Sequence, residues 1–241
     1  MTAQMHDRAI FQGKEFDLVG VNGLELFNPE KFEIKTAGIS SACWRGFLCQ
    51  YTIRENALTL DNLQVSSGHL GRTKFSPKKC PVINNISPFY TEDRGSPFNN
   101  MYENLNLKME FTGGILIADS FIYKLGVNMG FHPAWKYRLI YELTFDNGQT
   151  INIQDISKKM EEIREEMIQH PLEPGSDASY MEHARWVNST FSLVYSCENR
   201  EYKLNIGKEP EEDLSGLSLS ERLEKLGRLP DDLDESDANP A

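Results

Sequence analysis

Apolar and polar residues alternate with a period of two along much of this sequence, and tight turns separate the alternating runs. Side chains of a β-strand point alternately to opposite faces, so such a run builds one apolar and one polar face. The clearest run places five side chains on one face: Tyr137, Leu139, Tyr141, Leu143 and Phe145. The pattern predicts a mainly β protein, an antiparallel barrel or sandwich with one or two accessory helices.

Tight turns set the register of two hairpins, because apolar residues must meet across them. The turn at 55–56 predicts two apolar pairs: Ile53 with Leu58, and Tyr51 with Leu60. The turn at 199–200 predicts three: Cys197 with Tyr202, Tyr195 with Leu204, and Leu193 with Ile206.

Three further hairpins are predicted with other turns. A three-residue loop with Gly148 in the left-handed conformation sets Leu143 opposite Ile151, whereas a two-residue turn would set it opposite Asn152. A strand over 105–111 is expected to turn at 112–114 and return through Ile115 and Ile117. An opening hairpin would place Phe11 opposite Phe16.

Two segments have helical periodicity instead. The first begins at Ser157 and has an apolar stripe that we expect to lie across a sheet: Ile156, Met160, Ile163 and Met167. The second follows Ser218, which forms a capping box with Glu221, and has a leucine stripe: Leu219, Leu223 and Leu226. Between 66 and 104, glycines and prolines interrupt the pattern and predict a long irregular stretch.

Charge divides the chain into a body and an acidic tail. The formal net charge at pH 7 is −11, and residues 208–241 hold eleven acidic and four basic residues. We expect a β-rich body over 1–207, either one unit or two halves at 1–100 and 101–207, and an acidic tail over 208–241 with a short amphipathic helix. The nearly balanced body argues against nucleic acid or an anionic membrane as a partner.

The cysteines and histidines show no metal-site or redox spacing. Cys43, Cys49, Cys80 and Cys197 form no CxxC pair, and no glycine-rich loop precedes a helix. We therefore expect no metal and no cofactor. The opening residues lack a signal-peptide apolar region, and no run is long enough to cross a bilayer, so the expectation is a cytoplasmic protein with reduced thiols.

Two motifs are similar to those of a family of uncharacterised bacterial proteins. The motifs are Ser41-Ala42-Cys43-Trp44-Arg45-Gly46-Phe47 and Val127-Asn128-Met129-Gly130-Phe131, followed by the turn Asn147-Gly148. The family reads T-A-C-W-R-G-Y and Y-V-H-M-G-Y before an N-G hairpin, so Asn128 stands where the family has His. The resemblance covers roughly 36–65 and 105–155, and it implies no particular activity.

Two places are candidates for ligand recognition. Trp44 and Arg45 are adjacent, so in a strand their side chains point to opposite faces. Arg45 either binds an acidic group through its planar fork or forms a structural ion pair. The aromatic run 131–137 includes His132, Trp135 and Tyr137, and either exposes a binding platform or closes the end of the β core.

Two functional hypotheses follow, and the sequence leaves the oligomeric state open. The first is a non-catalytic binding module that recognises a protein partner or a small acidic ligand through Trp44, Arg45 and the 131–137 segment. The alternative is an enzyme that orients a small acidic substrate with Arg45 and uses His132 or Cys43 for proton transfer or attack. That alternative requires these side chains to converge on one cleft.

Overall fold

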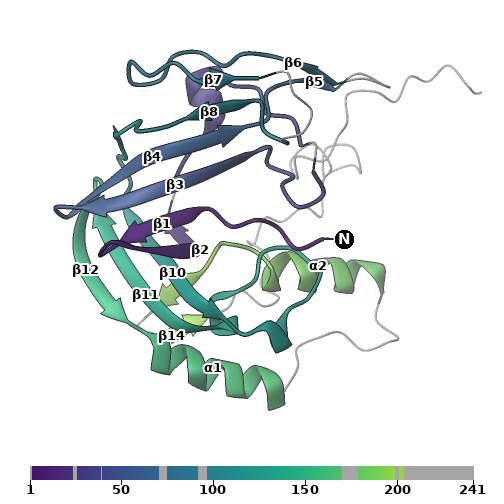
Figure 1. Cartoon of the computed structure of the whole chain (residues 1–241). Helices are drawn as coiled ribbons and strands as arrows, with labels where there is room; N and C mark the ends of the chain where they lie inside the picture. The colour runs from purple at the N-terminus through teal and green to yellow at the C-terminus, as the bar shows by residue number, and fades with distance from the viewer. Residues whose placement is uncertain are drawn as a thin grey trace, which may run out of the picture. The chain divides into compact units, whose positions relative to one another are not determined.

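The computed structural model describes residues 2–23, 26–38, 40–70, 75–91, 97–169, 179–198 and 201–203. They belong to one compact unit, Met1–Gly207. The acidic tail over 208–241 and its predicted helix lie outside the described residues. The fold is mainly β with accessory helices, which confirms the predicted class (Figure 1).

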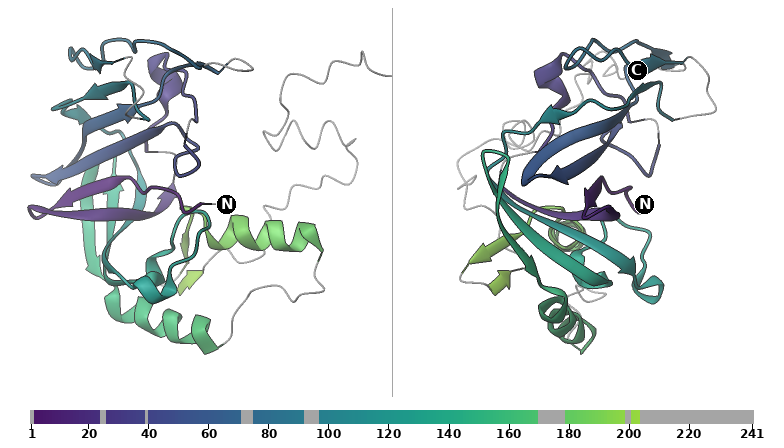
Figure 2. Two further views of the ribbon diagram at one scale, coloured as in Figure 1. Left: turned by 45° about the vertical axis from the view of Figure 1, so that its right-hand side comes forward. Right: turned by 60° about the vertical axis from the view of Figure 1, so that its left-hand side comes forward.

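Seven of the described strands form a closed ring. Its strands are β1 (Arg8–Phe11), β2 (Lys14–Gly23), β3 (Phe47–Arg54), β4 (Ala57–Val65), β10 (Gly113–Phe121), β11 (Tyr137–Asp146) and β12 (Gln149–Asp155). The order is β12-β11-β10-β2-β1-β3-β4, and a pairing of Gln149 with Ala57 closes the ring (Figure 2). The pair β1–β3 is parallel, and the other neighbours in the ring are antiparallel.

Short elements surround the ring. Seven short strands are also described: β5 (Gly68–Leu70), β6 (Phe75–Pro77), β7 (Phe89–Tyr90), β8 (Asn100–Tyr102), β9 (Leu107–Lys108), β13 (Ser196–Glu198) and β14 (Glu201–Lys203), of which the last two form a hairpin. The α-helices are α1 (Ser157–Gln169) and α2 (Tyr180–Thr190), and the 3₁₀ helices are η1 (Pro29–Phe32), η2 (Tyr123–Leu125) and η3 (Ala134–Lys136). Both β8 and β9 pair with β4 and extend the sheet beside the ring.

The interior of the ring is a packed apolar core. The ring of Phe11 on β1 lies 5.6 Å from that of Tyr141 on β11, although two strands separate β1 from β11 in the sheet. Such a contact passes through the interior, so the ring is filled by side chains. A second apolar cluster lies outside, where Met160 and Ile163 of α1 pack on Leu116 and Ile140.

The structure confirms the hairpin at 55–56 and part of the hairpin at 199–200. Ile53 opposes Leu58 and Tyr51 opposes Leu60, as predicted. Cys197 opposes Tyr202 as well. The predicted partners Leu204 and Ile206 lie outside the described residues.

Three predicted registers are wrong. Phe11 opposes Lys14 across a turn at 12–13, so Phe16 faces Ala9 instead. Leu143 opposes Ile153 because a two-residue turn combines with a bulge at Thr144/Phe145, and a bulge shifts pairing by one residue. Gly148 does have a positive φ of 77°. The predicted 105–117 hairpin does not form, because β10 pairs with β2 and β11.

The first predicted helix is confirmed, and one described helix was not predicted. Helix α1 begins at Ser157 and buries Met160 and Ile163. Helix α2 begins after Ser179, whose side chain accepts from the backbone N–H of Glu182 in a capping box. None of the described helices has the length and apolar character that a membrane span requires.

Candidate functional site

Arg45 is held in an ion pair by Asp7. Its two terminal nitrogens donate to the two carboxylate oxygens of Asp7 at 2.9 Å each. The guanidinium lies 4.9 Å from the ring centre of Phe47 and 5.3 Å from that of Phe131. Burial disfavours the charged guanidinium, but the charge and hydrogen bonds of Asp7 outweigh burial and raise the pKa of Arg45. The two terminal nitrogens of the Arg45 guanidinium are therefore already paired with the carboxylate of Asp7.

Asp7 also ties the N-terminal segment to β3. Its Oδ1 accepts the backbone N–H of Cys49 at 2.9 Å, and its side chain is buried. Trp44 beside the ion pair is 57% exposed, and its backbone N–H donates to Gln4 Oε1. The geometry at Arg45 is that of a structural pair, with Trp44 left at the surface.

The 131–137 segment packs on the outside of the ring, and most of its side chains are buried. Trp135 and Tyr137 are buried in the second apolar cluster, and η3 carries Trp135 there. His132 is partly exposed and stacks on Phe121 with 4.7 Å between ring centres. Of the five predicted recognition residues, His132 and Tyr137 line the groove described below; Trp44, Arg45 and Trp135 are not among its lining residues.

Cys43, the predicted alternative nucleophile, is buried. Its Sγ donates to the carbonyl oxygen of Phe47 at 3.4 Å. Burial raises the pKa of the Cys43 thiol, so the protonated and less nucleophilic form is favoured. Cys43 is also absent from the lining of the groove.

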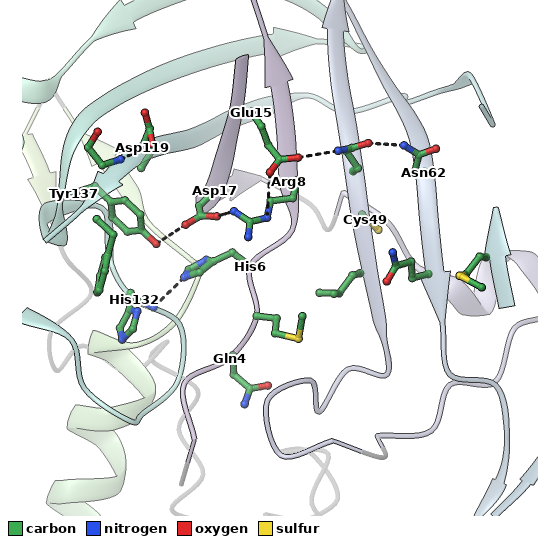
Figure 3. Close-up of a pocket in the computed structure, with 18 of the residues that line it drawn as sticks. Gln4, His6, Arg8, Glu15, Asp17, Cys49, Asn62, Asp119, His132 and Tyr137 are labelled. Atoms are coloured by element: carbon green, nitrogen blue, oxygen red, sulfur yellow. Dashed lines mark hydrogen bonds and ion pairs between the residues drawn. The ribbon is translucent and has the colours of Figure 1, made fainter. Parts of the chain in front are cut away.

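A groove of about 1190 Å³ lies on the outer face of the ring, across β2, β1, β3 and β4 (Figure 3). The same alternation that sends Phe16, Leu18 and Tyr51 into the core sends polar side chains outward from these strands. Residues 101–104 bound one side of the groove, and residues 118–123 bound the other.

A row of hydrogen-bonded polar side chains crosses the floor of the groove. Gln50 Nε2 on β3 donates to Glu15 Oε2 on β2 at 3.0 Å. Asn62 Nδ2 on β4 donates to Gln50 Oε1, and Asn62 Oδ1 accepts the backbone N–H of Asn104 at 3.2 Å. Each amide is thereby fixed in orientation by neighbours on both sides.

Arg8 and Asp17 continue the row toward Tyr137. Arg8 on β1 pairs with Asp17 on β2, and its Nε lies 3.9 Å from Glu15 Oε1. The hydroxyl of Tyr137 donates to Asp17 Oδ2 at 2.9 Å. Burial and the carboxylate of Asp17 both raise the pKa of Tyr137, so the phenol remains a donor. The row thus joins residues of β11, β2, β1, β3 and β4 (Figure 3).

His6 is fixed in one neutral tautomer at the edge of the groove. Its Nδ1 lies 3.0 Å from the carbonyl oxygen of Leu18 and must donate, while Nε2 accepts the backbone N–H of His132. Burial lowers the pKa of His6, and burial also lowers the pKa of His132. Both ring nitrogens of His6 are engaged in hydrogen bonds, so His6 holds the backbone at His132 against the N-terminal segment.

Among the described residues, no three His, Cys, Asp or Glu side chains gather in a way that would hold a metal ion. The groove offers amide and carboxylate groups at fixed positions on a rigid sheet. Such groups form hydrogen bonds with a polar ligand, and the site has no described nucleophile–base pair.

Comparisons with known proteins give no match to any family model, curated protein or solved structure. The resemblance of the Ser41–Phe47 motif to a bacterial family therefore stays a prediction.

Apart from Tyr137, the residues of the polar row were not predicted from the sequence. Their signal was present, because Glu15, Asp17, Gln50, Asn62 and Gln64 occupy polar positions of alternating runs. Their convergence depends on β1 lying between β2 and β3 in a parallel pairing with β3. Hairpin turns carry no information about that non-local pairing.

Proposed function

We propose that this protein is a non-catalytic ligand-binding β module and that the groove on the outer face of β2, β1, β3 and β4 is its binding site. One observation carries the proposal: hydrogen bonds and the ion pairs of Arg8 join the row from Tyr137 through Asp17, Glu15 and Gln50 to Asn62, and this row lines the groove. Side chains fixed before binding reduce the entropy that binding costs.

The chemistry of the described residues favours binding over catalysis. His6 has both nitrogens engaged, and the Cys43 thiol is buried in its protonated form. The phenol of Tyr137 donates to Asp17. General acid–base catalysis requires a group whose pKa lies near neutral pH and whose reactive atom is free to contact a substrate in the groove. None of these three groups meets both requirements.

The structure gives less support to a site for a small acidic ligand or substrate at Arg45. Its binding would have to displace the bidentate carboxylate of Asp7, which is 4% exposed. Breaking such a pair costs about 3 to 5 kcal/mol because a buried charge is left alone. A protein partner at the exposed Trp44 remains a prediction.

We also propose a cytoplasmic location. Cys43, Cys49 and Cys80 are buried free thiols in the described part of the chain. Thiols persist in the reducing cytosol and tend to oxidise in secreted proteins.

The test is a thermal-shift panel on the full chain with three chemical classes: neutral oligosaccharides, spermine, and citrate. A ligand that binds the folded state at a hundred times its Kd stabilises by about 2.7 kcal/mol. The Gln50→Leu variant removes the centre of the row, and Gln154→Leu on exposed β12 is the matched control. We expect one of the three ligand classes to stabilise the wild type and the Gln154→Leu control but not the Gln50→Leu variant.

Two results would contradict the proposal. Equal stabilisation of the wild type and a still-folded Gln50→Leu variant would place the site outside the groove. Mass spectrometry of the stabilising compound after incubation checks the non-catalytic claim, and a changed mass would favour the enzyme hypothesis.

A further inference from the structure

Most of the charges around the groove are paired, and the charge that remains is negative. Arg8, the cation among the lining residues, pairs with Asp17 and Glu15, and Lys14 pairs with Asp119 at 2.5 Å. Lowered pKa values keep His6 and His132 neutral at physiological pH. The exposed Glu103 adds a negative charge. An anionic ligand would find no unpaired cation among the described lining residues.

The polar row retains donors and acceptors that its internal hydrogen bonds do not use. The Gln50 and Asn62 amide nitrogens each have two hydrogens, and each donates one within the row. Gln64, the next outward residue on β4, is exposed, and its side chain makes no hydrogen bond to the described residues. Ionised Asp17 and Glu15 keep further lone pairs. A ligand with several neighbouring hydroxyl groups would match these amides and carboxylates, because each hydroxyl group can both donate and accept a hydrogen bond.

An aromatic surface stands at the other side of the groove. Tyr123 on η2 is 89% exposed, although a tyrosine normally buries most of its ring. Phe121 meets Tyr123 edge-to-face at 5.6 Å and stacks on His132, so the aromatic group is held in place. A sugar ring has an apolar C–H face and a polar hydroxyl edge, and this groove offers partners for both.

We propose that the groove binds a neutral oligosaccharide, with Tyr123 against the C–H face of one sugar and the amides of Gln50, Asn62 and Gln64 on the hydroxyl groups of sugars further along the same oligosaccharide. This inference rests on the proposed function of the groove. The volume of about 1190 Å³ exceeds that of most pockets for one small molecule, about 300 to 1000 Å³, and so fits more than one sugar unit.

The experiment is a glycan array that covers the common linkages of neutral hexoses and N-acetylhexosamines. The full-length wild type is compared with Tyr123→Ala, and Tyr180→Ala on α2 is the matched control because Tyr180 is 84% exposed and outside the groove lining. We expect the wild type and Tyr180→Ala to bind the same glycans. Calorimetric titration of a bound glycan should give a Kd roughly threefold to tenfold weaker for Tyr123→Ala.

The outcomes separate this inference from the proposed function. If spermine or citrate binds in a manner sensitive to Gln50→Leu and no glycan does, the oligosaccharide inference is wrong and the binding function stands. If neither the array nor those compounds give binding, both are wrong. Equal glycan affinity in wild type and Tyr123→Ala also overturns the proposed pose.

Discussion

Arg45 and Asp7 show how one ion pair can fix a chain segment. The carboxylate of Asp7 is nearly inaccessible and accepts from both the Arg45 fork and the backbone of Cys49. We predict that Arg45→Ala lowers the free energy of unfolding by about 3 kcal/mol, because it leaves the carboxylate buried and unpaired. Urea denaturation measures this.

A double variant provides the control for the Arg45 prediction. Asp7→Asn combined with Arg45→Leu removes both charges and should recover part of the lost stability. A loss of only about 0.5 kcal/mol in Arg45→Ala would mean that the pair behaves as an exposed one. Ligand binding in the groove should be unchanged in any folded Arg45 variant, since Arg45 does not line it.

Lys136 is a buried cation beside two aromatic rings. Its side chain is 3% exposed, with Nζ 5.2 Å from the ring centre of Trp135 and 5.1 Å from that of Phe191. Burial lowers the pKa of Lys136 from 10.5 to about 8. We predict that Lys136→Met stabilises the protein at pH 7 by about 2 kcal/mol, because the cost of burying a charge disappears.

The pH dependence tests the cause of that gain. Between pH 8 and 10.5 the unfolded chain keeps the Lys136 proton while the folded chain releases it, so wild-type stability rises with pH. The advantage of Lys136→Met should therefore shrink over this range. An advantage that is constant from pH 7 to 10.5 would show that packing, and not the charge, is responsible.

At the scale of elements, the β11–β12 turn fastens the ring. Gly148 accepts the N–H of Leu58 on β4 at 2.9 Å and donates to the carbonyl of Phe111 at 2.7 Å. Its φ is 77°, and a Cβ there would overlap the carbonyl oxygen of Met109. We predict that Gly148→Ala destabilises the fold by about 3 kcal/mol.

Gly13 in the β1–β2 turn is the matched control for Gly148. Its φ is 75°, and a Cβ there meets nothing within 4 Å. Gly13→Ala should cost about 1 kcal/mol from the left-handed backbone alone. Equal losses in the two variants, measured by urea denaturation, would show that the ring closure places no steric demand on Gly148.

Element prediction succeeded where local pattern and turn chemistry decide the structure. The hairpin at 55–56 has both turn residues, Glu55 and Asn56, at positive φ, and its register followed from the alternation. Helix α1 followed from its apolar stripe. The β11–β12 register failed because the bulge at Thr144/Phe145 leaves no mark in an alternating run. Ile151, the predicted partner of Leu143, is 65% exposed.

At the scale of the whole molecule, the candidate site depends on pairing between distant segments. The polar row exists because β1 pairs in parallel with β3 and β10 pairs with β2. Non-local pairings of this kind cannot be derived from turns, so sequence reasoning placed recognition at Arg45 and not along Glu15, Gln50 and Asn62. The aromatic run 131–137 points to Tyr137 and His132 from composition alone, and both residues line the groove.

The most direct test of the central claim is a ¹H–¹⁵N NMR titration of the full chain with a glycan selected from the array. Side-chain amide signals report the groove floor, because Gln50, Asn62 and Gln64 each contribute one NH₂ group. If the groove binds the glycan, these three signals shift together with the backbone signals of Phe121 and Tyr123, while the Gln154 amide on β12 stays constant. Shifts confined to residues around Trp44 and Arg45, with the groove amides unchanged, would contradict it.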